Sequence, residues 1–258
     1  MSVLQNLIGT MAFTRDWPHF LLNRLRRPNG DTQAFRLRNG QFISIANDQA
    51  FVLNEIFRER VYDVPGVDLR SCRTIVDLGA NVGVFALYAA ANAPNATIHC
   101  FEPAAATFAA LQENVNANQL NVVTHALAIS TSCGPARFYR AGRAVEWSLN
   151  SDPGAVCEEV NCIDLDHLFK LVDDDTIDFL KMNVEGVELD VLGSAADEQL
   201  RRIGVLSVEW HHPSESLVPL VNRLRQLEFD AGIEVADGNI RYLKARQHDF
   251  ASLHRDRC

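Results

Sequence analysis

The sequence predicts an α/β protein with a mostly parallel sheet flanked by helices, a terminal antiparallel hairpin and an N-terminal cap. From residue 74 onward, short β-rich runs alternate with helical stretches, which is typical of parallel sheets with crossover helices. Near the C-terminus, Asp237-Gly238 stands between two strand-like runs, and this pair is a two-residue hairpin signal. Residues 1–70 show helical patches and one hairpin pattern instead, so we expect a cap on residues 1–70 and a main domain on residues 71–258.

The cap contains two local patterns. Residues 35–38 and 41–45 alternate polar and apolar side chains around the turn signal Asn39-Gly40, which predicts a hairpin. Residues 21–27 combine leucines with arginines, which fits a basic amphipathic helix on a membrane or a partner, or a helix that packs on the main domain. We favour the packed helix because such short matches are common.

The main domain contains five expected strands, each rich in β-branched or aromatic residues and bounded by turn residues. They span residues 74–78, 97–102, 122–127, 177–183 and 203–210. Helices are expected at residues 82–93, 104–118, 188–192 and 217–227. Pro94 ends the first helix, and the second places Phe108, Leu111 and Val115 three and four residues apart. Residues 134–163 predict extra β structure, and residues 233–235 and 240–243 the terminal hairpin.

Composition excludes several classes of protein. A chain of 258 residues that is 47% hydrophobic can bury a full core. The net charge of −9 argues against a nucleic-acid partner, because phosphate binding needs a basic surface. No run reaches the ~20 apolar residues of a transmembrane segment, and the first residues lack a secretory signal pattern. We expect a reduced, cytoplasmic protein, and a homo-oligomer is left open.

The cysteines suggest neither a disulfide framework nor a zinc site, because they are scattered without CxxC pairs. They are Cys72, Cys100, Cys133, Cys157, Cys162 and Cys258. The acidic residues 173–175 are interpreted as a solvated turn, because consecutive carboxylates repel one another and cannot all face one ion. No metal is therefore expected.

A glycine-rich turn, Asp77-Leu-Gly-Ala-Asn-Val-Gly83, joins the first expected strand to the first helix. Gly79 and Gly83 tolerate positive φ and let the backbone approach a ligand closely. The turn lacks the GxGxxG pattern of dinucleotide-binding folds, and Asp77 puts a carboxylate where a pyrophosphate would need room. A cationic or zwitterionic ligand suits such a turn. S-adenosylmethionine has a sulfonium and an α-amino group and no phosphate, so it matches.

Glu102 ends the second expected strand, 25 residues after Asp77. A carboxylate at this place can accept hydrogen bonds from both ribose hydroxyls of a nucleoside ligand. This role is common to dinucleotides and S-adenosylmethionine, so Glu102 alone does not separate the two.

The chain resembles FkbM-type methyltransferases from about Arg73 to Trp210, roughly half of its length. The likeness rests on blocks that occur in the right order. They are Val76-Asp-Leu-Gly-Ala-Asn-Val-Gly83, Phe101-Glu-Pro103, Glu113-Asn-Val-Asn-Ala-Asn118, Ile163-Asp-Leu-Asp166, Phe179-Leu-Lys-Met-Asn-Val-Glu-Gly186 with Glu188 and Leu192-Gly193, and Val208-Glu209.

The resemblance implies a Rossmann-like class I methyltransferase fold, S-adenosylmethionine as the methyl donor, and usually a hydroxyl of a sugar or natural product as the acceptor. The expected cofactor-binding residues are Asp77, Gly79, Ala80, Asn81, Gly83, Glu102, Pro103, Ala128 and Asn183. The sequence departs from the family at one position: the usual Lys-x-Asp-Val-Glu-Gly is Lys181-Met-Asn-Val-Glu-Gly186. An amide at Asn183 can hydrogen-bond the cofactor or the acceptor but cannot accept a proton or give a metal a charged ligand.

Methyl transfer to a hydroxyl needs alignment and a general base at the carboxyl ends of the fourth and fifth strands. Glu185 is one candidate, and Glu209, His211 and His212 follow strand five. An unperturbed histidine has a pKa of about 6.5, which suits a base near neutral pH. The expected catalytic set is therefore Glu185, His211, His212 and Asn183, with the base itself undecided.

The main hypothesis is a small-molecule O-methyltransferase. One alternative is a methyltransferase-like protein that binds without turnover, which Asn183 suggests. A second is an NAD(P)-dependent oxidoreductase, which the missing third glycine opposes. A third is an RNA methyltransferase, which the acidic charge opposes.

Overall fold

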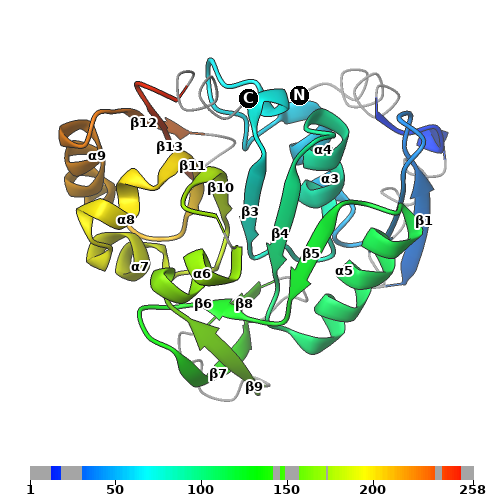
Figure 1. Ribbon diagram of the computed structural model, residues 1–258. Coiled ribbons are helices and arrows are strands. Elements are labelled where there is room, and N and C mark those ends of the chain that lie inside the picture. Colours follow the sequence, from blue (N-terminus) through cyan, green and yellow to red (C-terminus); the bar gives the residue numbers. More distant parts are fainter. Residues whose placement is uncertain are drawn as a thin grey trace.

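The structure is a computed structural model that describes residues 13–18, 31–141, 146–148, 157–172, 174–235 and 240–250. Its centre is a seven-stranded sheet with the order β12-β13-β11-β10-β3-β4-β5 (Figure 1). The strands are β3 (Thr74–Leu78), β4 (Thr97–Phe101), β5 (Val122–His125), β10 (Ile177–Met182), β11 (Ile203–Trp210), β12 (Phe229–Val235) and β13 (Arg241–Gln247). The five from β11 to β5 are parallel, whereas β13 is antiparallel to both β11 and β12.

This sheet confirms the predicted α/β fold with its terminal antiparallel hairpin. The bounds of β3 and β11 are those expected from the sequence, and the other parallel strands end one or two residues earlier than expected. The Asp237-Gly238 turn lies outside the described residues, but the strands on either side of it pair as predicted.

Helices cover both faces of the sheet, and each face has its own hydrophobic core. On one face lie α4 (Val84–Asn92) and α5 (Ala105–Ala117); on the other lie α6 (Leu165–Val172), α7 (Glu188–Ser194), α8 (Asp197–Arg201) and α9 (Leu217–Gln226). Consecutive strand residues point to opposite faces, so Ile75 belongs to the first core and Val76 to the second. Every residue of β3 is buried because both faces are covered.

The expected N-terminal hairpin is also present: β1 (Thr32–Arg36) and β2 (Phe42–Ala46) pair antiparallel. Two asparagines, one in α5 and one at its C-cap, form hydrogen bonds with the outer edge of β2. Asn114 exchanges two hydrogen bonds with the backbone of Ser44, at 2.8 and 2.9 Å, and Asn118 does the same with Phe42, at 2.7 Å each. The hairpin is thus fixed to the helix that follows β4.

After the hairpin, α3 (Phe51–Asn54) continues into the π-helical turn Glu55–Glu59. The residues that follow reach the sheet, where Tyr62 is buried against Phe85 of α4 and Tyr242 of β13. Residues 21–27, with their leucines and arginines, lie outside the described residues. The division at residue 70 stays a prediction.

A second, four-stranded sheet has the order β6-β9-β7-β8 and lies beside α6 (Figure 1). Its strands are β6 (Ala128–Ile129), β7 (Gly134–Ala141), β8 (Glu146–Ser148) and β9 (Cys157–Ile163), which confirms the expected extra β structure. The short helices α6 and α8 were not expected. In the parts of the chain described, no helix has both the length and the apolar character needed to cross a bilayer.

Candidate active site

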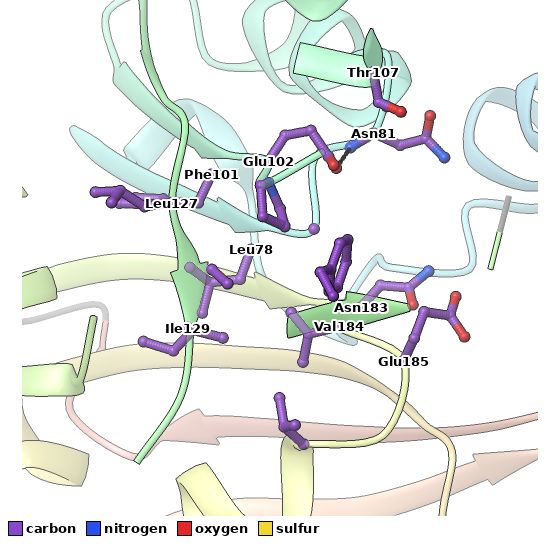
Figure 2. A pocket seen from close by; sticks show the side chains of 15 residues that line it. Leu78, Asn81, Phe101, Glu102, Thr107, Leu127, Ile129, Asn183, Val184 and Glu185 are labelled. Carbon is purple, nitrogen blue, oxygen red and sulfur yellow. Dashed lines mark hydrogen bonds between the residues drawn. The ribbon is translucent and has the colours of Figure 1, made fainter. Parts of the chain in front are cut away.

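Two clefts open where the parallel strands end. The first has a volume of about 700 Å³, including space open to solvent. Its apolar wall is formed by Leu78, Phe101, Leu127, Ile129, Phe138 and Val187, and its polar side chains include Asn81, Glu102, Thr107, Asn183 and Glu185 (Figure 2). Of the other expected cofactor-binding residues, Pro103 and Ala128 also line this cleft.

The glycine-rich turn forms one end of the first cleft. The N–H groups of Gly79 and Ala80 both donate to the carbonyl of Phe101, at 3.0 Å each, and Asn81 has a positive φ of 49°. Gly79 and Gly83 also stand where a side chain would not fit. A Cβ on Gly79 would lie 1.7 Å from the Asn183 carbonyl oxygen, and one on Gly83 would lie 2.8 Å from the Leu111 side chain.

Gly79 therefore lets the ends of β3 and β10 approach each other, and Gly83 lets α5 pack on the turn. Gly79 lines both clefts, whereas Gly83 lines neither. The sequence predicts that both glycines lie at the ligand, and for Gly83 the structure shows a packing contact, while its contact with a ligand stays a prediction.

Asp77 is fully buried and lines neither cleft. Its Oδ1 lies 2.8 Å from the Lys181 ammonium nitrogen, which also donates to the carbonyl of Gly79 at 2.8 Å. Burial raises the pKa of Asp77, and the neighbouring Lys181 lowers it. The cation beside Asp77 in this structure is a lysine of the next strand, because register pairs Lys181 with Asp77. The contact of Asp77 with a cationic ligand stays a prediction.

Glu102 lies in the first cleft but is only 7% exposed. Its Oε2 accepts from the backbone N–H of Asn81 (Figure 2) and its Oε1 from that of Ala104, both at 3.0 Å. Burial raises the pKa of Glu102 to about 7, against the lowering effect of the two backbone donors. Each carboxylate oxygen can accept a second hydrogen bond, so the position remains compatible with a diol ligand.

The second cleft lies between the main sheet and residues 45–62. Its volume is about 1140 Å³, including space open to solvent. Its apolar wall includes Ile45, Phe51, Ile56, Val84, Phe85 and Ile240, and its polar side chains include Glu55, Tyr62, Lys181, Glu209 and His211. Ala80 lines this cleft only, whereas Gly79, Asn81, Asn183 and Glu185 line both. These four residues form the wall between the clefts.

Asn183, at the end of β10, joins a hydrogen-bond network. Its side-chain N–H₂ donates to Glu209 Oε2 at 3.0 Å and to the Tyr62 hydroxyl oxygen at 3.2 Å. Tyr62 in turn donates to the same Glu209 oxygen at 2.7 Å. The buried Asn183 Oδ1 has no hydrogen-bond partner among the described residues. An amide oxygen left in this state is available to a donor from a ligand.

His211 is held among three carboxylates. Its Nδ1 lies 2.7 Å from Glu188 Oε1, and its Nε2 lies 3.4 Å from Glu185 Oε2 and 3.8 Å from Glu209 Oε1. Burial lowers the pKa of His211, but the hydrogen bond to Glu188 and the surrounding negative charges outweigh it and raise the pKa to about 9. A pKa of about 9 favours the protonated ring at pH 7, whereas an unperturbed histidine, with a pKa near 6.5, is mostly neutral there.

Glu188 organises both histidines from a fully buried position at the start of α7. It accepts from the backbone N–H of Gly186 at 3.1 and 3.2 Å, besides its contact with His211. His212 Nε2 lies 3.3 Å from Glu188 Oε2, and its ring packs on Trp210. His212 lines neither cleft, so the structure separates it from its neighbour His211.

The structure brings together several residues that sequence reasoning did not assign to the site: Glu55, Tyr62, Lys181 and Glu188. Burial and the nearby Glu209 raise the pKa of Glu55 to about 7. Glu188 belongs to the blocks that carry the family resemblance, but the sequence assigned it no role in the site. A signal existed for Lys181, because a cation inside a strand run needs a buried partner, but no pattern indicated that Tyr62 reaches Glu209.

A model of the methyltransferase FkbM domain matches residues 77–235. Among curated proteins, the 31-O-demethyl-FK506 methyltransferase FkbM of Streptomyces tacrolimicus is 36% identical over 108 residues, which are 41% of this chain and 42% of that protein. The AMB antimetabolite synthetase AmbE of Pseudomonas aeruginosa is 27% identical over 246 residues, 76% of this chain and 11% of AmbE. The chain thus spans less than half of either relative.

Two further similarities have broader mutual coverage. Methyltransferase sdnD of Sordaria araneosa is 28% identical over 197 residues, 64% of this chain and 75% of that protein. Among solved structures, the N-terminal domain of human METTL16 in complex with SAH has a TM-score of 0.45 at 15% identity, covering 88% of this chain and 93% of that chain. Because the family model spans more than half of the chain, this protein belongs to the FkbM family of methyltransferase domains.

Proposed function

We propose that this protein is an S-adenosylmethionine-dependent O-methyltransferase that acts on a hydroxyl of a small molecule. The observation that carries the proposal is the wall shared by the two clefts, formed by Gly79, Asn81, Asn183 and Glu185. Transfer of a methyl group needs donor and acceptor in line and in contact. Two clefts that share these four lining residues would bring donor and acceptor next to each other.

The first cleft fits the cofactor. Its apolar wall, with Phe101 and Phe138, suits an adenine ring, and Glu102 offers oxygens to a ribose diol. The buried Oδ1 of Asn183 offers an acceptor for an ammonium donor at the wall between the clefts. When bound there, S-adenosylmethionine supplies a methyl group already activated by its sulfonium.

In the second cleft, Glu185 is the residue we propose as general base, because its side chain lines both clefts (Figure 2). His211 lies 3.4 Å from it and is protonated at pH 7, so His211 acts as a positioning cation and not as the base. Asn183 contributes hydrogen bonds only. His212 supports Glu188 from outside the clefts.

The acceptor that we propose is a sugar or natural-product hydroxyl. The second cleft combines an apolar wall with the carboxylates of Glu55, Glu185 and Glu209, and carboxylates accept hydrogen bonds from hydroxyl groups. The name of the Streptomyces tacrolimicus relative, a 31-O-demethyl-FK506 methyltransferase, also supports an oxygen acceptor.

A second candidate is a methyltransferase-like protein that binds the cofactor without turnover, which the amide at Asn183 favours. Titration calorimetry with S-adenosylhomocysteine, with NADH in a parallel cell, tests the cofactor. Micromolar binding of S-adenosylhomocysteine alone supports the proposal, and binding of NADH alone rejects it. A labelled-methyl assay over a panel of sugars and macrolides then separates the two candidates, because only an enzyme labels an acceptor.

A variant pair tests the site itself. Glu185→Gln should lower kcat by about 100-fold or more, as loss of a general base does, and leave the affinity for S-adenosylhomocysteine within about threefold. Glu113→Gln, on the exposed side of α5, is the matched control and should change neither quantity. An unchanged kcat in Glu185→Gln would mean that a group other than Glu185 accepts the proton of the acceptor hydroxyl.

A further inference from the structure

Three side chains outside both clefts converge at the junction of the small sheet and α6. They are Cys133, in the turn between β6 and β7, Asp164, between β9 and α6, and His167, in the first turn of α6. One donor atom from each lies within 4.8 Å of the other two. Nothing in the proposed methyl transfer uses them.

The strand pairing explains why these residues meet. β6 runs parallel to β9, and the N–H of Ser130 continues that pairing by donating to the carbonyl of Ile163 at 2.8 Å. The chain leaving β6 and the chain leaving β9 therefore end side by side. The turn before β7 then carries Cys133 to the start of α6, where Asp164 precedes the helix.

Two of the three donors are held by local structure. Asp164 Oδ1 accepts from the backbone N–H of His167 at 2.9 Å, and its carbonyl accepts from the N–H of Leu168 at 2.9 Å. This is the geometry of a helix N-cap. The cap holds Asp164 and His167 in a fixed arrangement at the first turn of α6. The His167 side chain is 50% exposed, which leaves it open to an ion from solution.

The contacts differ from those of a catalytic triad. In a triad, the nucleophile and the carboxylate bind different nitrogens of the histidine ring. Here Cys133 Sγ lies 3.1 Å and Asp164 Oδ1 lies 2.7 Å from the same atom, His167 Nδ1. Sulfur, nitrogen and oxygen thus face one common point instead of forming a relay.

We propose that Cys133, Asp164 and His167 form a zinc-binding site that fastens the β6–β7 turn to α6. A thiolate, a carboxylate and a neutral imidazole carry a total charge of −2, which Zn²⁺ neutralises. Zn²⁺ binds each of these ligand types, and a water would complete the tetrahedron. Donor atoms around a tetrahedral zinc lie about 3.5 Å apart at the usual bond lengths. The present distances need to open by less than about 1 Å for the ion to replace the shared protons.

The position of this site gives it a link to the first cleft. β6, whose following turn carries Cys133, supplies Ala128 and Ile129 to the wall of that cleft. An ion bound at this junction would hold the small sheet against α6 and so hold that wall. The site differs from the expectation of no metal, because no CxxC or HxxxH spacing joins Cys133 to Asp164, 31 positions later.

The test uses the full chain, stripped of metal by a chelator and titrated with Zn²⁺ against a chromophoric competitor. We expect one tight Zn²⁺ site per chain. Both Cys133→Ser and His167→Ala should bind Zn²⁺ at least tenfold more weakly than the wild type. The matched controls are Cys157→Ser, at an exposed cysteine of β9, and His248→Ala, at an exposed histidine after β13; neither should alter binding. Equal affinity in Cys133→Ser and wild type would overturn the proposal.

Co²⁺ substitution gives a readout specific for the thiolate. The Co²⁺ form of the wild type should show a sulfur-to-metal charge-transfer band that is absent from Cys133→Ser and present in Cys157→Ser. Circular dichroism should show all four variants folded, so a lost site cannot be read as a lost fold. A band that persists in Cys133→Ser, or no band in wild type, would also reject the site. Neither outcome depends on S-adenosylhomocysteine binding, which tests the methyltransferase proposal separately.

Discussion

The hydroxyl of Tyr62 donates a 2.7 Å hydrogen bond to Glu209, although 147 residues separate the two in the chain. Tyr62 belongs to the segment before the first strand of the main sheet, and Glu209 lies in its fifth parallel strand. The contact also holds Asn183, which donates to both residues. It therefore joins the N-terminal wall of the second cleft to the boundary between the clefts.

Tyr62→Phe removes this hydroxyl and should lower the free energy of unfolding by about 1.5 to 3 kcal/mol, since the lost bond is buried and its acceptor is charged. Urea unfolding measures the loss. Tyr88→Phe is the control, because Tyr88 makes a bond of equal length to Asp63 outside the network. If the network serves catalysis, only Tyr62→Phe also changes the acceptor KM; equal KM values in both variants would limit Tyr62 to stability.

The buried Asp77–Lys181 pair predicts strong coupling between two substitutions. Asp77→Asn or Lys181→Met alone leaves one buried charge without its partner and should cost about 3 to 5 kcal/mol. The double variant should cost less than the two single losses together, by at least about 1 kcal/mol. A double-mutant cycle in urea gives the coupling energy. Additive losses would mean that the 2.8 Å contact does not stabilise the fold.

The raised pKa of His211 predicts a stability that falls at high pH. Its pKa is about 6.5 in the unfolded chain and about 9 in the folded protein. The folded state thus binds the proton more tightly, so the stabilisation is complete below pH 6.5 and is lost as the pH rises through 9. Relative to His211→Gln, wild type should lose at most about 3 kcal/mol over this range. A difference that stays constant with pH would show that the ring is not charged in the fold.

Glu102 predicts a pH dependence of cofactor binding. With a pKa of about 7, it becomes a better acceptor for ribose hydroxyls as the pH rises from 6 to 8. Affinity for S-adenosylhomocysteine should rise over that range in wild type and stay flat in Glu102→Gln. At pH 8 the variant should bind about 10- to 150-fold more weakly, which corresponds to about 1.5 to 3 kcal/mol. Calorimetry at three pH values measures both effects, and parallel pH profiles would remove Glu102 from the ribose site.

Gly79→Ala tests the close approach of the two strand ends. The new Cβ would overlap the Asn183 carbonyl oxygen, and Gly79 has a positive φ of 74°. The loss of stability should exceed about 3 kcal/mol, because backbone and not a mobile side chain stands in the way. Gly232→Ala, with no atom within 4 Å of the added Cβ, should cost less than about 1 kcal/mol. Similar losses at both positions would place the strain elsewhere.

The sequence predicted the sheet well because buried parallel strands have a strong local pattern. Both β3 and β11 are mostly apolar runs with few polar residues, and their bounds were expected correctly. The helix α6 was missed, although its residues 165, 168, 169 and 172 are buried at helical spacing, because it directly follows the strand-like run that was expected to end at residue 163.

The site was harder to predict than the fold, because its contacts depend on strand order and packing. The partner of Asp77 follows from β10 lying beside β3, which no local pattern reveals. The pKa of His211 depends on carboxylates that come from a loop, a helix and a strand: Glu185, Glu188 and Glu209. The residues at strand ends were found because parallel strands bring their carboxyl ends to one edge of the sheet.

The two clefts differ in how they relate to the region shared by the family. The family match begins at residue 77, whereas one wall of the second cleft, from Ile45 to Tyr62, precedes it. The family model therefore does not include this wall. We expect acceptor choice to be transferable between relatives by exchanging residues 45–62 alone, with the affinity for the methyl donor carried unchanged by the rest of the chain.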